Sequence, residues 1–439
     1  MEHNRVIIVG TIPYNKNTSS RAFDAYFHNW EKENIRQIFS NTKTPVKGHC
    51  GSLYQITDQR LLKRWLHKTK EVGRIFEYED LPDDWENNDL EVGSKTVGNL
   101  YKIGSKGSPL KHILRGILWK NKFWNTKKLN DWLDEFKPEC VFLAFSDDYF
   151  IPRIALYISE KYDIPIMSCI GDDYYFNDKK SLSLFYHIYR KTYKNLIDKV
   201  FKRPGSAMYI GNKIRDKYNK EFGLNGETIY LTSDIERREF KPIDIEDPKI
   251  IYCGNISMGR NNSLVDIGNA LQKINPNYHL DVYSAETKEE YIKPLNDCLG
   301  VTFHGAVPYT EVMKLTKESD INIIVEGFNK KDIDITRYSL STKAADAIAS
   351  GGNIFAYGDI NCGVIEYMQG TDCAVVCTDK DKLENDLKKL IFDEELQKKL
   401  YNKAILVDKQ DHDKVKNRSL TESMFVKLVE ENNRRKNER

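Results

Sequence analysis

The sequence predicts an α/β protein built from two Rossmann-like, doubly wound domains that face each other across a cleft. The chain has 439 residues, which is too long for a single domain with one hydrophobic core of ordinary size. Short continuous apolar runs recur along it, as in the strands of a parallel sheet that is covered on both faces. Amphipathic helical stretches separate most of these runs, and this repeated strand–helix–strand order predicts right-handed crossover units.

The first domain is expected to span residues 1–204. Its predicted strands are 5–10, 34–40, 140–145 and 164–170, and a helix is predicted at 151–161. The sequence Lys-Arg-Pro-Gly at 202–205 has the composition of a turn, and the domain boundary is therefore placed there.

The second domain is expected at 205–410, and a terminal amphipathic helix follows within 411–439. The predicted strands are 206–210, 228–231, 249–253, 279–283, 301–305, 321–325, 353–357 and 374–377. The predicted helices are 212–222, 263–274, 309–317, 341–350 and 380–391.

Composition and missing motifs exclude several classes of protein. Lys+Arg minus Asp+Glu is 67 − 65 = +2, which argues against a nucleic-acid-binding role. The sequence contains no run of 18 apolar residues, so no transmembrane helix is predicted, and the first residues lack the features of a signal peptide. The eight cysteines are scattered, which favours reduced thiols and a cytoplasmic location. The dinucleotide, P-loop, nucleophile-elbow and zinc-protease motifs are also missing.

One region has an unusual charge pattern. Residues 71–91 are rich in acids, whereas 101–128 contain eight Lys or Arg and no acid. One predicted helical face here carries Leu110, Ile113, Leu114, Ile117, Leu118 and Trp124, with Lys111, Arg115 and Lys122 largely off it. With Trp119 and Phe123 nearby, this pattern suits the surface of an anionic membrane. It equally suits a helix that docks on its own sheet, and the acidic and basic stretches can also pair with each other.

A glycine-rich turn follows the strand predicted at 249–253 and leads into a helix. Gly254 and Asn255 begin the turn, and Arg260 stands at the start of the helix. Glycine lets the backbone approach an anion, and Arg supplies a planar charged fork. The turn is therefore a candidate diphosphate clamp, the alternative being an ordinary strand-to-helix connection.

A second candidate anion site lies in the stretch RYSLSTKAADAIASGGNIFAYGD. Ser339, Ser341 and Thr342 form a hydroxyl-rich helix start, Lys343 lies in the first turn, and Asp346 follows one turn later. Hydroxyls, free N–H groups and a Lys at a helix N-terminus favour phosphate. The alternative is a Ser cap with a solvated Lys.

Polar residues also follow two strands of the first domain. Gly10 and Thr11 come after the first strand, and Asp172 and Asp173 after the fourth. Open parallel sheets bind ligands beyond the carboxyl ends of their strands. The two carboxylates can hold sugar hydroxyls or act as a base, and they can equally cap helices.

The stretch YSLSTKAADAIASGGNIFAYGD resembles the nucleotide-sugar signature of GT-B glycosyltransferases, and is most similar to family-4 enzymes of bacterial surface-polysaccharide synthesis. The resemblance continues over most of the second domain, through IIYCGNISMGR, VTFHGAVPYTEVMKL and SDINIIVEGFN. The first half is similar in outline only, mainly in VFLAFSDDYFIPRIALYISEKYDIPIMSCIGDD.

The resemblance implies that Arg260 and Lys343 neutralise the diphosphate of a donor sugar nucleotide, with UDP expected before GDP. The loop His304–Val307, which includes Gly305, Ala306 and Val307, would contact the base. By the same likeness the terminal helix would cross back to the first domain.

The resemblance also indicates where this chain departs from the family. Asp346 stands at the second Glu of an E-x7-E motif and Tyr338 at the first, so Glu326 is a candidate for the missing carboxylate. Ser339, Ser341 and Thr342 would then contact phosphate and sugar. Asp172 falls near the place where relatives carry a His beside the sugar.

The implied activity is a cytoplasmic hexosyltransferase that moves a sugar to a glycan or lipid-linked acceptor. Retention is expected, and no metal or other cofactor is required. An inverting enzyme would instead use Asp172 or Asp173 as a base. Two alternatives stay open: a non-catalytic GT-B partner subunit, supported by the altered E-x7-E motif, and a GT-B nucleotide-sugar epimerase.

Overall fold

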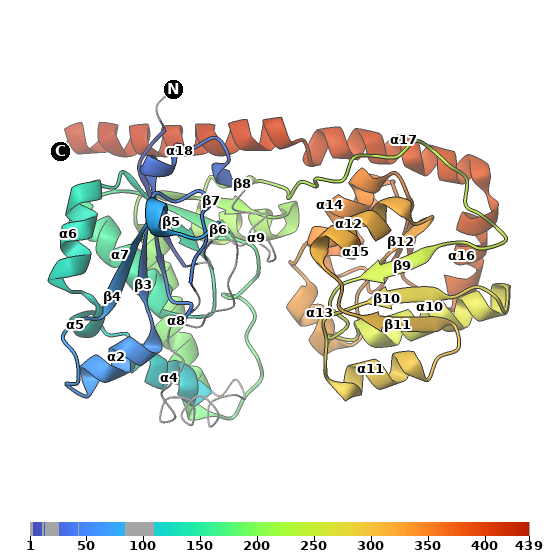
Figure 1. Ribbon diagram of the computed structural model, residues 1–439, viewed down its shortest axis with the longest axis horizontal. Helices are drawn as coiled ribbons and strands as arrows, with labels where there is room; N and C mark the ends of the chain where they lie inside the picture. The colour runs from blue at the N-terminus through green and yellow to red at the C-terminus, as the bar shows by residue number, and fades with distance from the viewer. Residues whose placement is uncertain (1–2, 11–12, 14–25, 43, 84–108, 439) are drawn as a thin grey trace. The chain divides into compact units, whose positions relative to one another are not determined.

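The structure is a computed structural model that describes residues 3–10, 13, 26–42, 44–83 and 109–438. The chain forms two compact units, shown in Figure 1. The first unit comprises Met1–Ile229 and Arg418–Arg439, and the second unit comprises Tyr230–Asn417.

The first unit contains a sheet of eight strands in the order β4-β3-β2-β1-β5-β6-β7-β8. Its strands are β1 Val6–Val9, β2 Ile35–Phe39, β3 Ser52–Ile56, β4 Gly73–Glu77, β5 Cys140–Ala144, β6 Ile166–Ile170, β7 Gly205–Tyr209 and β8 Glu227–Thr228. Neighbouring strands run parallel except β3 and β4, which are antiparallel. All four residues of β1 are buried, because the sheet is covered on both faces.

Helices of the first unit cover these faces. They are α2 Asp58–Trp65, α4 Pro109–Leu118, α5 Asn121–Trp124, α6 Lys127–Phe136, α7 Phe150–Tyr162, α8 Leu184–Lys202 and α9 Asn212–Phe222, with short 3-10 turns at Lys32–Asn34 and Tyr78–Asp80. One core contains Ile7 and Val9 of β1 together with residues of α2, α6 and α7. The other core contains Val6 and Ile8, which point to the opposite face.

The end of the chain packs into this second core. Helix α18 (Lys414–Asn437) buries Met424, Phe425, Leu428 and Val429, a spacing that places all four on one helical face. The ring of Phe425 lies 5.8 Å from that of Phe27 and 6.3 Å from that of Phe142. The residues from Arg418 onward therefore belong to the first unit.

The second unit contains a six-stranded parallel sheet in the order β11-β10-β9-β12-β13-β14. Its strands are β9 Ile250–Cys253, β10 Leu280–Tyr283, β11 Val301–Gly305, β12 Ile321–Val325, β13 Asn353–Tyr357 and β14 Val375–Cys377. Counted within the unit, this order is 3-2-1-4-5-6, the doubly wound arrangement of a Rossmann domain.

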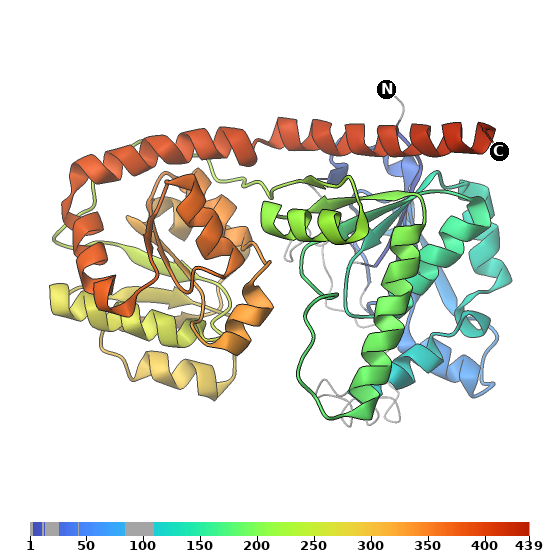
Figure 2. The same cartoon turned by 180° about the vertical axis from the view of Figure 1, so that it is seen from behind.

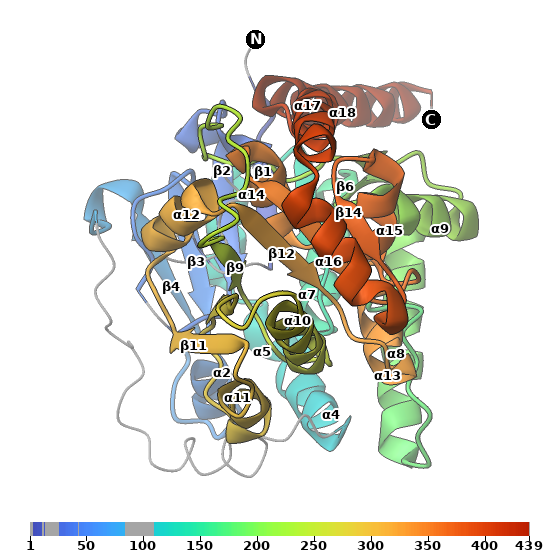
Figure 3. The ribbon, with the colours of Figure 1, turned by 90° about the vertical axis from the view of Figure 1, so that its right-hand side faces the viewer.

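Two layers of helices cover this sheet, as Figure 3 shows. Helices α10, α11 and α16 pack together on one side, and α12, α14 and α17 pack on the other. The helices are α10 Arg260–Ile274, α11 Glu289–Asn296, α12 Tyr309–Glu318, α13 Lys330–Thr336, α14 Thr342–Ser350, α15 Gly363–Thr371, α16 Leu383–Phe392 and α17 Glu394–Asp411, with a 3-10 turn at Lys380–Lys382.

The division of the chain differs from the boundary expected at 202–205. The strands expected to open the second domain, at 206–210 and 228–231, correspond to β7 and β8. Both strands extend the first sheet, because β7 pairs with β6 and β8 pairs with β7. The turn at 202–205 therefore connects α8 to the next strand of the same sheet, and the units divide between Ile229 and Tyr230.

Two further observations bear on the sequence predictions. All eight cysteines are unpaired and six of them are buried; Cys140, Cys169, Cys253 and Cys377 lie in strands. Among the described helices, none combines the length and the apolar character that a bilayer-spanning segment needs.

Candidate functional site

The candidate site lies at the carboxyl edge of the second sheet, between β9 and β12. These strands are neighbours; α10, which follows β9, and α14, which comes between α13 and β13, cover opposite faces. This is the switch point of a doubly wound sheet, where backbone N–H groups and helix N-termini are open to a ligand. The loops after β9 and β12 therefore decide what binds here.

The loop after β9 depends on glycine at two positions. Gly254 has φ +150°, and a Cβ there would lie 2.6 Å from Nζ of Lys343. Gly259 has φ +77° and precedes α10, and a Cβ there would lie 2.7 Å from Oδ2 of Asp332. Both positions combine a backbone conformation that favours glycine with a close neighbour. At these two positions the loop therefore presents backbone atoms without a side chain at the edge of the sheet.

Arg260, the first residue of α10, forms a buried ion pair with Glu326, the first residue after β12. Its Nε lies 3.0 Å from Oε2 and its Nη2 lies 2.9 Å from Oε1. Only 8% of Arg260 and 3% of Glu326 is exposed. Burial lowers the pKa of Arg260, but the Glu326 carboxylate outweighs this effect and the pKa is raised. Glu326 therefore fixes the guanidinium and leaves Nη1 as the nitrogen without a hydrogen-bond partner among the described residues.

Lys343 reaches the same loop from the first turn of α14. The Ser341 hydroxyl caps this helix and accepts a hydrogen bond from the Lys343 N–H. Nζ of Lys343 lies 2.9 Å from the Tyr252 hydroxyl, which in turn donates to the Asn255 carbonyl at 2.5 Å. The structure thus brings together Gly254, Asn255 and Lys343. The contribution of Tyr252 was missed, because a buried strand tyrosine carries no distinctive sequence signal.

Asp346 lies one turn further along α14 and is buried. Its Oδ1 accepts a hydrogen bond of 2.5 Å from the Ser233 hydroxyl. Together with Lys343 and Cys253 it lines a cavity of about 30 Å³, which has room for one water molecule. The expected ribose contact of Asp346 stays a prediction, because its carboxylate faces Ser233 in this structure.

The remaining predicted residues of the second unit lie in two further loops. Tyr338 and Ser339 are half-buried, and the Ser339 carbonyl would lie 2.7 Å from a Cβ at Gly363, the first residue of α15. Thr342 is exposed. These residues border the amino ends of α14 and α15, and their expected contacts with phosphate and sugar stay predictions.

The loop after β11 contains Gly305, Ala306 and Val307. Gly305 has φ +76° and open space around its Cα, and Ala306 is exposed. The ring of His304 stacks on Tyr283 at 4.6 Å with an interplanar angle of 11°. This flat aromatic pair lies at the ends of β10 and β11, and Tyr283 was not among the residues predicted from the sequence.

The two aspartates predicted in the first unit have different environments. Asp173 Oδ1 accepts hydrogen bonds from the backbone of Tyr175 at 3.1 Å and Phe176 at 2.9 Å, and from the Tyr218 hydroxyl at 2.8 Å. It therefore closes the loop after β6 and ties it to α9. Asp172 is exposed, and it helps to raise the pKa of Tyr174, after the larger effect of burial.

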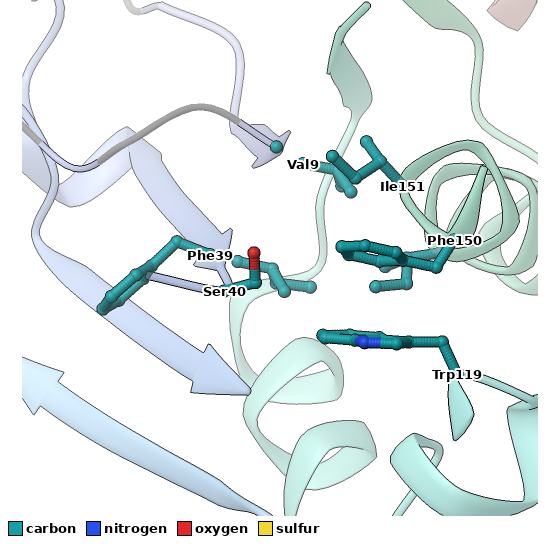
Figure 4. A pocket seen from close by; sticks show the side chains of 9 residues that line it. Val9, Phe39, Ser40, Trp119, Phe150 and Ile151 are labelled. Carbon is teal, nitrogen blue, oxygen red and sulfur yellow. The ribbon is translucent and has the colours of Figure 1, made fainter. Parts of the chain in front are cut away.

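Gly10 lies at the corresponding switch point of the first sheet, between β1 and β5. Its φ is +92°, and a Cβ would lie 3.2 Å from both Ala144 and Ile151. Thr11 lies outside the described residues. Figure 4 shows the small pocket beside Gly10, in which the ring of Phe150 stacks on Trp119 at a centroid distance of 3.9 Å.

The basic stretch at 101–128 differs from its predicted membrane-facing arrangement, and its residues up to 108 lie outside the described chain. Trp119 and Trp124 are 1% and 0% exposed. The Arg115 guanidinium contacts Asp58 at 3.0 Å and Asp148 at 2.5 Å. Burial raises the pKa of Asp148, although Arg115 opposes this shift. The expectation that these three side chains face a membrane was therefore wrong, because they complete the interior of the first unit.

Comparison with known proteins identifies the fold class of this chain. No protein-family model matches the sequence, and no curated protein matches it either. The two parallel-sheet units match the GT-B fold of solved glycosyltransferase structures over nearly the whole chain.

Particular matches include Anabaena HepE in complex with UDP, with a TM-score of 0.57, 12% identity, and coverage of 96% of this chain and 100% of that chain. Sucrose-phosphate synthase from Thermosynechococcus elongatus matches with a TM-score of 0.56 and 10% identity, and the match covers 96% of this chain and 98% of that chain. A mutant form of S. aureus TarM, in complex with Fondaparinux, alpha-GlcNAc-glycerol and UDP, matches with a TM-score of 0.54 and 12% identity. This match covers 97% of this chain and 99% of that chain. At sequence identities this low, the comparisons show a shared fold only.

Proposed function

We propose that this chain is a glycosyltransferase that binds a nucleotide diphosphate sugar on its second unit and transfers the sugar to a glycan or lipid-linked acceptor. The observation that carries the proposal is the arrangement at the β9–β12 switch point. There Arg260 and Lys343 border the glycine-rich loop that begins at Gly254, and they stand at the N-termini of α10 and α14.

The chemistry of glycosyl transfer requires such an arrangement. Breaking the bond between a sugar and a diphosphate builds negative charge on the departing phosphate. Fixed cations and helix N-termini stabilise this charge more in the transition state than in the ground state. Glu326 holds Arg260 in place before the donor arrives, so little reorganisation is needed. The proposal includes no metal or further cofactor.

One observation favours UDP over GDP as the nucleotide, and a second supports base stacking in general. HepE and TarM, which share the fold, were crystallised with UDP. The stacked pair of His304 and Tyr283 offers a flat surface at the same sheet edge, and aromatic faces suit stacking of a base.

The finer parts of the proposal rest on the sequence. The stretch from Tyr338 to Asp359 supports a family-4-like enzyme of bacterial surface-polysaccharide synthesis that retains the anomeric configuration. For an inverting reaction the base would be Asp172, because Asp173 Oδ1 already accepts two hydrogen bonds within its own loop and one from Tyr218 of α9. Determining the anomer of the product by NMR distinguishes the two outcomes.

Ligand binding tests the donor site directly. Thermal-shift and calorimetric titrations with UDP, GDP, ADP and their sugar conjugates are expected to show saturable stabilisation with UDP first. Absence of binding to every nucleotide diphosphate would contradict the proposal and favour a non-catalytic partner subunit.

Turnover then distinguishes the remaining alternatives. A transferase hydrolyses its donor slowly and releases UDP much faster with the right acceptor. Conversion of the donor into an epimeric nucleotide sugar without any acceptor would instead identify an epimerase.

A further inference from the structure

Exposed apolar side chains gather at one place in the first unit. Sixteen large apolar residues are exposed in the part of the chain that the structure describes, and seven of them lie on α4 and around the start of α8. These are Leu110, Leu114, Ile117, Leu182, Leu184, Phe185 and Ile188. Leu182 and Leu184 are the most exposed of the seven, at 105% and 70%. Scattered apolar residues are ordinary on a protein surface, but a cluster marks a site of interaction.

The two helices pack against each other, so their residues form one continuous surface, called here the α4–α8 surface. The ring of His112 stacks on that of Tyr189 at 4.5 Å, and the Tyr149 hydroxyl donates to the Ile113 carbonyl at 3.3 Å. Figure 2 shows α4 (teal) beside the amino-terminal part of α8 (green).

Both helices carry apolar residues on the side that faces away from the protein. Leu110, Leu114 and Ile117 recur at intervals of four and three residues and form one stripe on α4. The opposite side of α4 is used for packing, since a Cβ at Gly116 would overlap the Tyr149 hydroxyl. A helix that faces only water carries polar residues on its outer side, so these stripes predict a partner.

The two chain segments that form this surface carry cations and no acid, although the exposed side chains of Asp147 and Asp178 lie beside them. The sequence contains no Asp or Glu in 109–130 or in 179–197. Six lysines there are exposed and form no ion pair with a described residue, namely Lys120, Lys122, Lys128, Lys179, Lys180 and Lys191. Arg115 and Arg190 do not add to this set, because Asp58 and Asp178 neutralise them inside the first unit.

We propose that the α4–α8 surface docks on a bilayer that contains anionic phospholipid. Apolar side chains enter the boundary between headgroups and acyl chains, and the lysines contact the phosphates. Stable attachment of this kind needs both contributions together. The charge pattern favours this partner, because an apolar patch beside exposed lysines that form no ion pair with a described residue matches an anionic membrane surface. Docking goes beyond the proposed transfer of sugar and holds whether or not the chain is an enzyme.

Binding to vesicles tests the proposal with the full-length protein. The chain is expected to float with phosphatidylglycerol-containing vesicles at 0.1 M salt and not with pure phosphatidylcholine. The variant Leu114→Gln/Leu184→Gln/Ile188→Gln is expected to lose flotation. The variant Lys179→Gln/Lys180→Gln/Lys191→Gln is expected to bind about a hundredfold more weakly, at about fivefold per lysine.

Matched controls come from exposed positions of the second unit. Leu299→Gln/Leu406→Gln and Lys398→Gln/Lys399→Gln are expected to bind vesicles like the unchanged protein, since these side chains are exposed outside the α4–α8 surface. UDP affinity, measured on every variant, checks that the protein is folded. Loss of UDP binding alone would count against the proposed function and not against membrane docking.

Two results would overturn the proposal. One is flotation of both triple variants that equals that of the unchanged protein. The other is absence of vesicle binding together with a concentration-dependent dimer, seen by analytical ultracentrifugation, that Leu114→Gln/Leu184→Gln/Ile188→Gln abolishes. That second result would assign the surface to a second copy of this chain.

Discussion

Arg260 and Lys343 are both cations beside the loop after β9, yet the structure gives them different partners. Among the described residues, the Lys343 ammonium group donates a hydrogen bond only to the neutral hydroxyl of Tyr252. Arg260 is held by the carboxylate of Glu326. The sequence alone suggested equal roles in binding a diphosphate. The structure separates them, so that removing Lys343 affects the ligand and removing Arg260 also affects the fold.

Replacement of Lys343 tests ligand binding without disturbing the core. Lys343→Ala is expected to weaken UDP binding by about 1.5–3 kcal/mol, or roughly ten- to a hundredfold, the range of a hydrogen bond to a charged group. Isothermal titration calorimetry measures this change. Lys314→Ala, on the exposed side of α12, serves as the control and is expected to leave the affinity unchanged. Equal affinity in Lys343→Ala and the unchanged protein would remove Lys343 from the site.

Replacement of Arg260 is expected to destabilise the second unit. Arg260→Ala leaves the Glu326 carboxylate buried without its partner, and breaking a buried pair in this way costs about 3–5 kcal/mol. The double variant Arg260→Met/Glu326→Leu is expected to recover most of that stability and still bind UDP weakly. Urea unfolding measures the stability of both variants, and calorimetry measures their UDP binding. An Arg260→Ala protein as stable as the unchanged one would show that the pair does not form.

At the scale of elements, His412 joins the end of α17 to the segment that enters the second unit. Its Nδ1 lies 2.6 Å from the Leu231 carbonyl and its Nε2 lies 2.9 Å from the Tyr367 hydroxyl. Because a carbonyl can only accept, Nδ1 carries the proton of the neutral ring. Burial lowers the pKa of His412 below the usual value of about 6.5 for a histidine side chain. The neutral ring therefore belongs to the folded state.

This lowered pKa predicts a loss of stability in mild acid. Below pH 6.5 the unfolded chain takes up a proton that the folded protein refuses, so the free energy of unfolding falls as pH decreases toward the folded pKa. Above pH 6.5 the contribution of His412 is constant. His412→Gln is expected to flatten this part of the curve when urea unfolding is compared at pH 7.5 and pH 5.5. An unchanged slope in the variant would assign the acid sensitivity to other groups.

Apolar runs located most strands, because a parallel sheet covered on both faces selects continuous hydrophobic segments. This pattern missed β3, Ser52–Ile56, in which all five residues are buried although two are polar. There the Gln55 side chain donates to the Asn41 carbonyl, which lowers the cost of its burial. Helix α8 was missed for a related reason, since Tyr186, Tyr189 and Tyr193 form much of its buried side.

The candidate site was predictable only in part. The glycine-rich turn and the helix start at Ser341 carry local signals, and they led to Gly254, Arg260 and Lys343. The pairing of Arg260 with Glu326 joins residues 66 positions apart, and no local pattern reports such a contact. The inward position of Arg115 was likewise hidden, because its partners are distant in the sequence: Asp58 begins α2, and Asp148 lies in the loop before α7.

At the scale of the whole molecule, the chain combines two parallel-sheet units of eight and six strands. Each sheet has a switch point at which a glycine with positive φ follows the central strand, Gly10 after β1 and Gly254 after β9. The same architectural position therefore recurs in both units. Only the second unit joins this position to two cations at helix N-termini among the described residues, which is why the nucleotide is assigned to it.

A crystal structure of the full chain with UDP tests this assignment most directly. The diphosphate is expected beside Gly254, within hydrogen-bonding distance of Lys343 Nζ and of the Arg260 nitrogen that Glu326 leaves open. A nucleotide bound to the first unit, or clear density for UDP away from both cations, would contradict the account.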